Sequence, residues 1–545
     1  MKPIHRDFLW WQTGVIYQIY PRSFKDSNGD GVGDLAGIIH QLDYLSETLG
    51  IDAIWLSPIY PSPMADFGYD VADYTSVDPI FGDMEVFDRL VKETHGRGLK
   101  LIIDFVPNHT SIQHAWFQES IASRDNPKRD WYIWADPRTD GSPPNNWLSL
   151  FGGSAWELEP KTGQYYLHSF LKEQPDLNWR NPQVKEAMFD VIRFWLDRGV
   201  DGFRIDVAHF ILKDPLLRDN PHRKIAGPDM HKSMGAYDAQ VHLYDKDHPD
   251  THEVYRELRQ LLESYSADQP RFSIGEIHYF QWQKWSAYYG QNLDELHMPF
   301  NFHLLKSPWN ARAVRSVVDA QETAIPAGAW PNYVLGNHDE PRLASRLGKP
   351  ASRVAAMLLL TLRGTPTLYY GDEIGMADRS ISPEERKDPF GIRVPGLGRD
   401  GCRTPMQWTS DPNAGFSAPE TRQLWLPLGN DYQEINIARQ LQETDSILNL
   451  YRQLLAYRKR SPALQMGQLL PIESTPSDCF AYIRKFPGAR QIIVGLNFSS
   501  NYLNLQFNDL GQGEVVISTN LDRSGRIDLS DWVLRPNEGA IIELG

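Results

Sequence analysis

Short apolar runs alternate with amphipathic stretches over the first two thirds of the chain. The runs are bounded by turn-forming residues, as strands are, and the stretches carry apolar residues three and four positions apart, as helices do. Eight strands are predicted: residues 15–19, 53–57, 99–106, 200–206, 272–276, 298–302, 333–339 and 367–371. Helices are predicted over residues 35–49, 84–94, 184–196 and 439–458. This alternation predicts an α/β fold whose parallel sheet closes into a (β/α)8 TIM barrel.

Two regions depart from this alternation. Residues 108–176 are rich in Trp, Pro, Gly and Asn without useful helical periodicity, which predicts a small domain inserted after strand 3 and overhanging the carboxyl face. Residues 467–545 carry short alternating runs, which predict a C-terminal antiparallel β-sandwich domain. The barrel is then built from residues 1–107 and 177–466. Residues 218–252 are polar and predict a loop or lid.

The charge and cysteine content narrow the class of partner. A net charge of −15 and a pI near 5.5 argue against a nucleic-acid groove and an anionic membrane surface. No stretch approaches the roughly 20 apolar residues of a membrane helix, and the amino terminus lacks the pattern of a signal peptide. Cys402 and Cys479 form neither a disulfide framework nor a metal cluster. A cytoplasmic protein is predicted, monomeric or weakly homo-oligomeric.

A loop after the first predicted strand has the composition of a calcium site. Oxygen-bearing side chains occupy every second position, with a glycine for the sharp turn, and a hard cation such as Ca²⁺ selects such oxygens. The alternative is an Asx-rich turn without metal. A structural Ca²⁺ is favoured, and no organic cofactor is expected. The predicted ligands are Asp26, Asn28, Asp30, Asp34 and the carbonyl of Val32.

Carboxylates follow several predicted strands. Asp206, Glu276 and Asp339 stand at the carboxyl ends of three strands, and Asp104 stands at a fourth. Each alone could be a cap or a salt-bridge partner. Together they should converge on one cavity, where clustered negative charge repels and is costly as a stability device. Convergent carboxylates are what glycoside hydrolysis requires.

The neighbours of these carboxylates predict different roles. Arg204 lies two residues before Asp206 on the same strand face, so it should favour the ionised form and make Asp206 the nucleophile candidate, although a buried structural ion pair is the alternative. Glu276 follows an apolar run with no cation beside it in sequence, so desolvation could keep it protonated as the acid/base. Asp339 would then hold substrate hydroxyls, and His109 and His338 could grip others.

Four segments together resemble glycoside hydrolase family 13, the α-amylase family. They are residues 104–109, 202–206, 274–276 and 336–339. The segment Gln174-Pro-Asp-Leu-Asn178 is similar to the motif of the oligo-1,6-glucosidase and α-glucosidase branch. Residues 403–408 and 68–70 recur there, and residues 26–34 match that branch's calcium loop.

The resemblance implies a retaining, exo-acting α-glucosidase that acts on short α-glucosides. Asp206 would be the nucleophile, Glu276 the acid/base and Asp339 the transition-state stabiliser. The residues implied to hold the terminal glucose are Tyr69, Asp70, His109, Arg204, His338 and Arg399.

Several readings stay open beside this one. His209 replaces the family's usual asparagine, which leaves the aglycone preference open. Val207, directly after the candidate nucleophile, is the residue type that resembles 1,6-cleaving members at this position. A transglucosylase or sugar isomerase on the same scaffold is an alternative. A non-catalytic binding subunit is a third, disfavoured because the acidic trio is kept.

Overall fold

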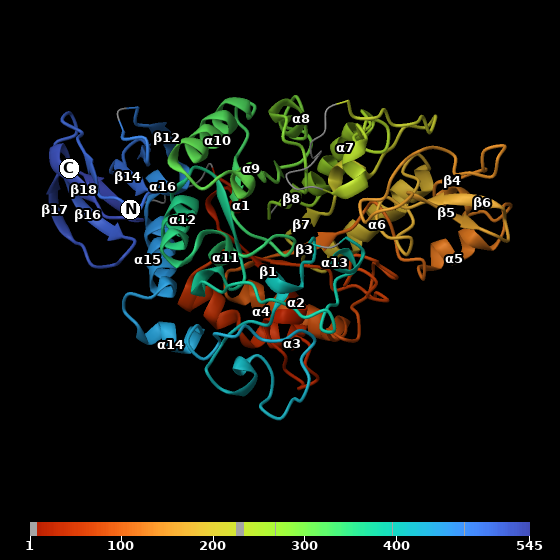
Figure 1. Ribbon diagram of the computed structural model, residues 1–545, viewed down its shortest axis with the longest axis horizontal. Coiled ribbons are helices and arrows are strands. Elements are labelled where there is room, and N and C mark those ends of the chain that lie inside the picture. The colour runs from red at the N-terminus through yellow and green to blue at the C-terminus, as the bar shows by residue number, and fades with distance from the viewer. Residues whose placement is uncertain (1–7, 225–233, 268, 395, 474) are drawn as a thin grey trace.

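The computed structural model describes residues 8–224, 234–267, 269–394, 396–473 and 475–545 (Figure 1). Its centre is an eight-stranded parallel sheet with the strand order β10-β11-β1-β2-β3-β7-β8-β9. The strands are β1 (Ile16–Ile19), β2 (Ala53–Leu56), β3 (Lys100–Phe105), β7 (Gly202–Ile205), β8 (Phe272–Gly275), β9 (Met298–Pro299), β10 (Asn332–Val334) and β11 (Thr365–Tyr369). The predicted TIM-barrel fold class is confirmed.

The barrel closes between β9 and β10 through side chains. The strand order ends at these two strands, which are two and three residues long. Asn332 bridges them: its Nδ2 donates to the carbonyl of Pro299 at 2.6 Å, and its Oδ1 accepts the backbone N–H of Asn301 at 3.0 Å. The sheet is therefore nearly closed by backbone pairing, and one buried amide side chain spans the remaining gap.

Helices between the strands surround the barrel (Figure 1). They include α3 (Leu35–His40), α4 (Met84–Gly96), α6 (Pro182–Asp197), α7 (Thr251–Ser264), α10 (Ala311–Ala324), α12 (Lys349–Thr361) and α15 (Ile447–Arg460). In α6 the start is fixed by Asn181, whose side chain accepts the N–H of Gln183, and by Pro182 in the first turn. The helix ends before Gly199, whose φ of 96° only glycine adopts readily. That end feeds the chain into β7.

The structure adds three details to the predicted helices. Residues 35–49 form α3 and a separate π-helix, Tyr44–Leu49. Residues 439–458 are divided between α14 (Ile437–Gln442) and α15, because the Ser446 side chain caps a new helix by accepting the N–H of Asn449. The inserted region contains α5 (Ala115–Ala122), which spans only eight residues and so shows little periodicity.

The region inserted after β3 carries its own small sheet. Strands β4 (Trp134–Ala135), β5 (Trp156–Glu159) and β6 (Gln164–Leu167) are antiparallel, in the order β4-β6-β5, and lie at one end of the molecule (Figure 1, orange). Trp147 stacks on Trp156 in its core, with ring centroids 6.1 Å apart. A bridge between His109 and Asp176 joins the start and the end of the insertion. The insertion is thus anchored next to the carboxyl end of β3.

The C-terminal part is antiparallel and lies at the opposite end of the molecule (Figure 1, blue). Its strands are β12 (Gln468–Pro471), β13 (Cys479–Lys485), β14 (Ile492–Asn497), β15 (Leu503–Leu505), β16 (Gln512–Ser518), β17 (Gly525–Asp528), β18 (Trp532–Leu534) and β19 (Gly539–Leu544). A six-stranded sheet and the β15–β18 pair enclose an apolar core that includes Phe507, Trp532 and Ile542. The domain limits given from the sequence stay predictions. None of the helices in the described ranges is both long and apolar enough to cross a membrane.

Candidate active site

The register of three neighbouring strands brings the predicted carboxylates together. In β3 and β7, Asp104 is the partner of Arg204, and in β7 and β8, Ile205 is the partner of Gly275. Asp206 and Glu276 each come directly after that last pair, and their backbone N–H groups extend the ladder by donating to Phe105 and Ile205 at 2.8 and 2.9 Å. Their side chains therefore emerge next to each other at the carboxyl end of the barrel.

Arg204 joins three of these carboxylates. Its Nη1 lies 2.7 Å from Asp104 Oδ1 and 2.8 Å from Asp206 Oδ1, and its Nη2 lies 2.6 Å from Glu276 Oε2. The guanidinium is 2% exposed. A planar fork suits such multidentate contacts, and burial makes each of them strong. One side chain thus fixes the spacing of Asp206 and Glu276.

The predicted difference in environment between the two carboxylates was wrong. Arg204 contacts Glu276 as well as Asp206, and His278 Nε2 lies 2.6 Å from Glu276 Oε1. Burial raises the pKa of Glu276, but Arg204 and His278 outweigh it and hold the pKa below its usual value. Burial raises the pKa of Asp206 well above its usual value, with Arg204 opposing and Glu276 adding to the rise. These opposite directions favour a proton on Asp206 over a proton on Glu276.

Val207 adopts an unusual backbone conformation directly after Asp206. Its φ of 35° and ψ of 48° lie in the left-handed region, which costs about 1–3 kcal/mol for a residue other than glycine. The conformation aims the Val207 N–H at Glu276 Oε2, 3.1 Å away. The strained turn directly after Asp206 therefore binds Glu276 through the backbone, in addition to the contact that both carboxylates make with Arg204.

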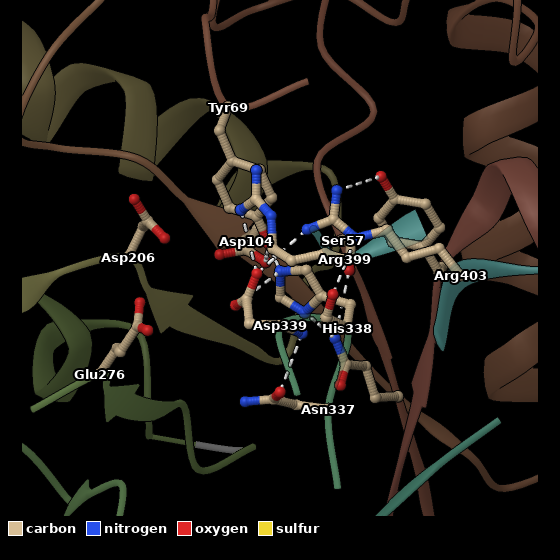
Figure 2. A network of polar contacts seen from close by, with 12 residues as sticks. Ser57, Tyr69, Asp104, Asp206, Glu276, Asn337, His338, Asp339, Arg399 and Arg403 are labelled. Atoms are coloured by element: carbon tan, nitrogen blue, oxygen red, sulfur yellow. Dashed lines mark hydrogen bonds and ion pairs between the residues drawn. The ribbon is translucent and has the colours of Figure 1, made fainter. Parts of the chain in front are cut away.

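Asp339 stands apart from this pair, next to two arginines and a histidine. Its Oδ1 lies 3.1 Å from Arg399 Nη1 and 3.0 Å from Arg403 Nη2, and its Oδ2 lies 3.2 Å from His338 Nε2 (Figure 2). Burial raises the pKa of Asp339, but these three groups outweigh it and hold the pKa well below its usual value. Strand β10 ends at Val334, so Asp339 lies on the following loop and not on the strand as predicted.

His338 and Tyr69 form one wall of the site. Their rings stack with centroids 5.4 Å apart and 1° between the planes, and the Tyr69 hydroxyl lies 2.7 Å from His338 Nε2. Gln18 holds the other ring nitrogen at 2.7 Å. Burial lowers the pKa of His338 to about 3, so the ring is neutral. Figure 2 shows this group beside Asp339, with Asp206 and Glu276 across from it.

The structure places Asp66, not Asp70, in the pocket. The Asp70 carboxylate accepts hydrogen bonds from Ser62 Oγ and from the backbone N–H groups of Ala65 and Asp66, each at 2.9 Å, and is buried beneath that turn. Asp66 instead lines the pocket and pairs with Arg399 at 2.7 Å. The prediction for Asp70 was therefore wrong. Asp66 could have been considered from the sequence, because it lies in the same short turn, three residues before Tyr69.

A buried lysine links the insertion to His109. Lys213 Nζ lies 2.6 Å from Asn108 Oδ1 and 2.5 Å from Asp176 Oδ2, and both ions are almost completely buried. His109 follows Asn108, and its Nε2 lies 3.0 Å from the Tyr69 carbonyl. Burial lowers the pKa of His109 to about 4, which leaves it neutral. Sequence reasoning missed Lys213, which no motif marks.

Most of the side chains described above line one pocket of about 740 Å³, counted with its opening to solvent. Polar and titratable side chains lie around Asp206 and Glu276, whereas an apolar cluster that includes Phe151, Phe170 and Phe390 lies alongside. The lining residues are Asp66, Tyr69, His109, Leu150, Phe151, Phe170, Gln174, Asp206, Val207, Phe210, Met234, Glu276, His278, His338, Asp339, Glu340, Phe390 and Arg399. Arg204 lies beneath them. Part of the predicted lid, residues 225–233, lies outside the described residues.

The predicted calcium loop is organised by its own backbone amides. The Asp26 carboxylate accepts the N–H groups of Asn28, Gly29 and Gly31 at 2.7–3.0 Å, and Asp34 accepts that of Gly37 at 2.6 Å. Asn28 and Asp30 each accept an N–H two residues on, as in Asx turns. Over the described part of the chain, no three His, Cys, Asp or Glu side chains gather as a metal site. Calcium at Asp26, Asn28, Asp30, Val32 and Asp34 stays a prediction.

Comparison with known proteins gives consistent matches. The family described as Alpha amylase, catalytic domain, matches residues 18–467. A probable alpha-glucosidase of Rhizobium meliloti (strain 1021) is 44% identical over 481 residues, 86% of each chain. An oligo-1,6-glucosidase of Heyndrickxia coagulans is 38% identical, over 98% of this chain and 99% of its own.

Solved structures match over almost the whole chain. The alpha-glucosyl transfer enzyme XgtA is 43% identical, with a TM-score of 0.90 over 99% of this chain and 100% of its own. The trehalulose synthase MutB from Pseudomonas mesoacidophila MX-45 is 35% identical, with a TM-score of 0.87 over the same shares.

Proposed function

The chain belongs to glycoside hydrolase family 13, the α-amylase family, and is a glycoside hydrolase; from this premise we propose that it is a retaining, exo-acting α-glucosidase that removes terminal glucose from short α-glucosides. One observation carries the proposal. A single buried guanidinium, that of Arg204, contacts both Asp206 and Glu276. This holds two carboxylates close together in one pocket, as retaining enzymes need, because inverting enzymes must leave room for a water between them.

In the first step, an Asp206 oxygen bonds to the anomeric carbon of the terminal glucose. The bond from that carbon to the glycosidic oxygen breaks, its electron pair stays on the oxygen, and Glu276 gives that oxygen a proton. Arg399 and Arg403 keep Asp339 charged, so it can stabilise the positive charge that develops at the sugar. In the second step, Glu276 takes a proton from water, whose oxygen displaces Asp206. The glucose leaves with its α configuration.

The proton on this pair must move before the first step. The contacts of the ligand-free site favour it on Asp206, whereas the reaction needs it on Glu276. Because the two carboxylates share Arg204, the reactive form is the other arrangement of the same single proton. Substrate binding beside Asp206 would favour its charged form and move the proton to Glu276.

The other polar groups of the pocket fit a terminal glucose unit. Asp66, His109, His338 and Arg399 present hydrogen-bonding groups within one enclosed space, and the Tyr69 ring offers a stacking face. Asp66 and Arg399 are ion-paired and both line the pocket, and we infer that this pair blocks it to internal sugar units and so favours chain ends. We propose these residues, with Arg204 below, as the binding set in place of the set that includes Asp70.

A second candidate is transfer of glucose to a sugar acceptor, including isomerisation. Two observations favour it. Structural neighbours are a glucosyl transfer enzyme and a trehalulose synthase by name, and the apolar side chains of Phe151, Phe210, Met234 and Phe390 flank the pocket, where they limit water beside the glucosyl-enzyme. The two reactions differ only in what captures the glucosyl-enzyme.

Two further properties are proposed with the activity. Asp26, Asn28, Asp30, Asp34 and the Val32 carbonyl would hold a structural Ca²⁺ that stabilises the loop before α3. A cytoplasmic location is supported by the two buried, unpaired thiols of Cys402 and Cys479.

The proposal is tested by following hydrolysis of maltose, isomaltose, sucrose and trehalose by NMR. Glucose should appear first as the α anomer from at least one of these sugars. First release of β-glucose would mean inversion and would contradict Asp206 as nucleophile. The yields of free glucose and of new disaccharides distinguish hydrolysis from transfer, and the preferred sugar gives the linkage, which Val207 hints is 1,6.

A further inference from the structure

His278 lies beside the proposed acid/base carboxylate and lines the same pocket. Its Nε2 is 2.6 Å from Glu276 Oε1, and its ring lies flat on Phe302, with centroids 4.7 Å apart and 9° between the planes. The stacking fixes the plane of the ring. The ring edge is therefore held against one oxygen of Glu276.

The two oxygens of Glu276 have different partners. Arg204 Nη2 and the N–H of Val207 both contact Oε2, at 2.6 and 3.1 Å. His278 contacts Oε1. Arg204 is shared with Asp104 and Asp206, so its charge favours all three carboxylates. His278 and the Val207 N–H are the contacts described for Glu276 that Asp206 lacks, and of the two His278 is the one that comes from a side chain.

The other charged and titratable groups around Glu276 come from several elements. Asp104 adds negative charge from the end of β3 and Asp339 from the loop after β10, and Asp206 follows directly after β7. His209 Nδ1 lies 3.3 Å from the Glu276 carbonyl, and its ring centroid lies 6.0 Å from that of His278. Burial, together with Lys246 and His278, lowers the pKa of His209 well below its usual value, so that ring is neutral. Lys246 adds positive charge on this side.

We propose that His278 is a positioning residue that determines which of the two catalytic carboxylates holds their shared proton, by binding Glu276 in its charged form and leaving the proton on Asp206. The inference rests on the proposed function, in which Glu276 gives a proton in the first step and takes one in the second. With the proton on Nε2, His278 donates to Oε1, which opposes the first step and assists the second. The lowered pKa of Glu276 and the raised pKa of Asp206 agree with this direction.

The test uses two glucosides that differ in their need for an acid. Methyl α-glucoside needs a proton on its leaving oxygen, whereas 2,4-dinitrophenyl α-glucoside does not. On the alkaline side of the optimum, kcat/KM for the methyl glucoside measures how often Glu276 is protonated. The ratio used is kcat/KM for the methyl glucoside divided by kcat/KM for the dinitrophenyl glucoside. This ratio removes effects on sugar binding that both substrates share.

Replacing His278 should make Glu276 a stronger base. We expect His278→Leu to raise this ratio about tenfold on the alkaline side, the value of one pKa unit, because a hydrogen bond to a charged group is lost. His278→Gln, which keeps a neutral donor, should raise it a few-fold. The control is His303→Leu, which removes a ring that stacks on Trp282 and bonds to the Phe280 carbonyl; its ratio should not change.

The outcomes separate the two proposals. A ratio that is unchanged or lowered, in whichever His278 variant melts cooperatively like the wild type, overturns the role of His278. A uniform loss with both glucosides, and no change in their ratio, would mean a merely structural role and overturns it too. A wild-type protein that cleaves neither glucoside refutes the proposed α-glucosidase activity instead.

Discussion

Replacing Arg204 by lysine tests the arrangement on which the proposed mechanism depends. Lysine keeps the positive charge, but its single nitrogen cannot reproduce the fork that contacts Asp104, Asp206 and Glu276 together. The side chain is 2% exposed, so water cannot replace the lost donors freely. Asp206 and Glu276 should therefore lose their fixed spacing while the net charge of the site stays the same.

The magnitude follows from the contacts. Hydrogen bonds to charged groups contribute about 1.5–3 kcal/mol each, and lysine should lose at least two of the three. Proton uptake by the carboxylates offsets part of this loss. We expect about 3 kcal/mol of transition-state stabilisation to disappear from Arg204→Lys, which is roughly a 10²-fold fall in kcat/KM. The fold should survive, because no buried charge is removed.

The assay is kcat/KM on the preferred α-glucoside, with a thermal melt to confirm folding. Arg97→Lys is the matched control, because Arg97 also contacts two carboxylates, Asp43 and Glu93, but lies on the surface at 27% exposure; its kcat/KM should stay within about twofold of wild type. A folded Arg204→Lys variant with less than about a fivefold loss would refute the view that the fork sets the spacing.

Three other changes have defined outcomes. Glu276→Gln should lower turnover by roughly 10² to 10⁴ with an unchanged melt, and near-normal turnover would remove Glu276 from the acid/base role. Lys213→Met leaves Asp176 buried without its cation, so urea unfolding should show a loss of about 3 kcal/mol; the more exposed pair of Lys185 with Glu257 is the control, and an equal loss in Lys185→Met would contradict the argument. Chelation with EGTA should lower the melting temperature if Ca²⁺ binds at residues 26–34, and an unchanged melt would contradict that site.

The barrel and the placing of Asp206 and Glu276 at its rim could be predicted because local patterns determine both. A strand that ends in a carboxylate places it at the rim of a parallel barrel whatever the rest of the chain does. Asp206 and Glu276 emerge side by side for this reason. The position of Asp339 does not follow from this local rule, because β10 ends at Val334 and a loop carries the residue into the pocket.

The protonation states could not be predicted, because they depend on contacts that sequence order hides. Arg204 is two residues from Asp206 in the sequence yet lies equally close to Glu276 from the next strand. His278 is as near to Glu276 in sequence as Arg204 is to Asp206, but only the stacking on Phe302 shows that its ring turns toward the carboxylate. Asp66 and Asp70 occupy one tight turn, and the fold of that turn alone decides which of them faces the pocket.

The gap between β9 and β10 has a consequence for how the molecule opens. Elsewhere in the barrel a strand must break several backbone bonds to separate from its neighbour, but here the buried amide of Asn332 provides the joint. Local opening should therefore start at this joint, where the fewest bonds must break. Deuterium should enter the amides of residues 298–302 and 332–334 sooner than those of β2 and β3, and the loop that carries Asp339 begins directly beyond that joint.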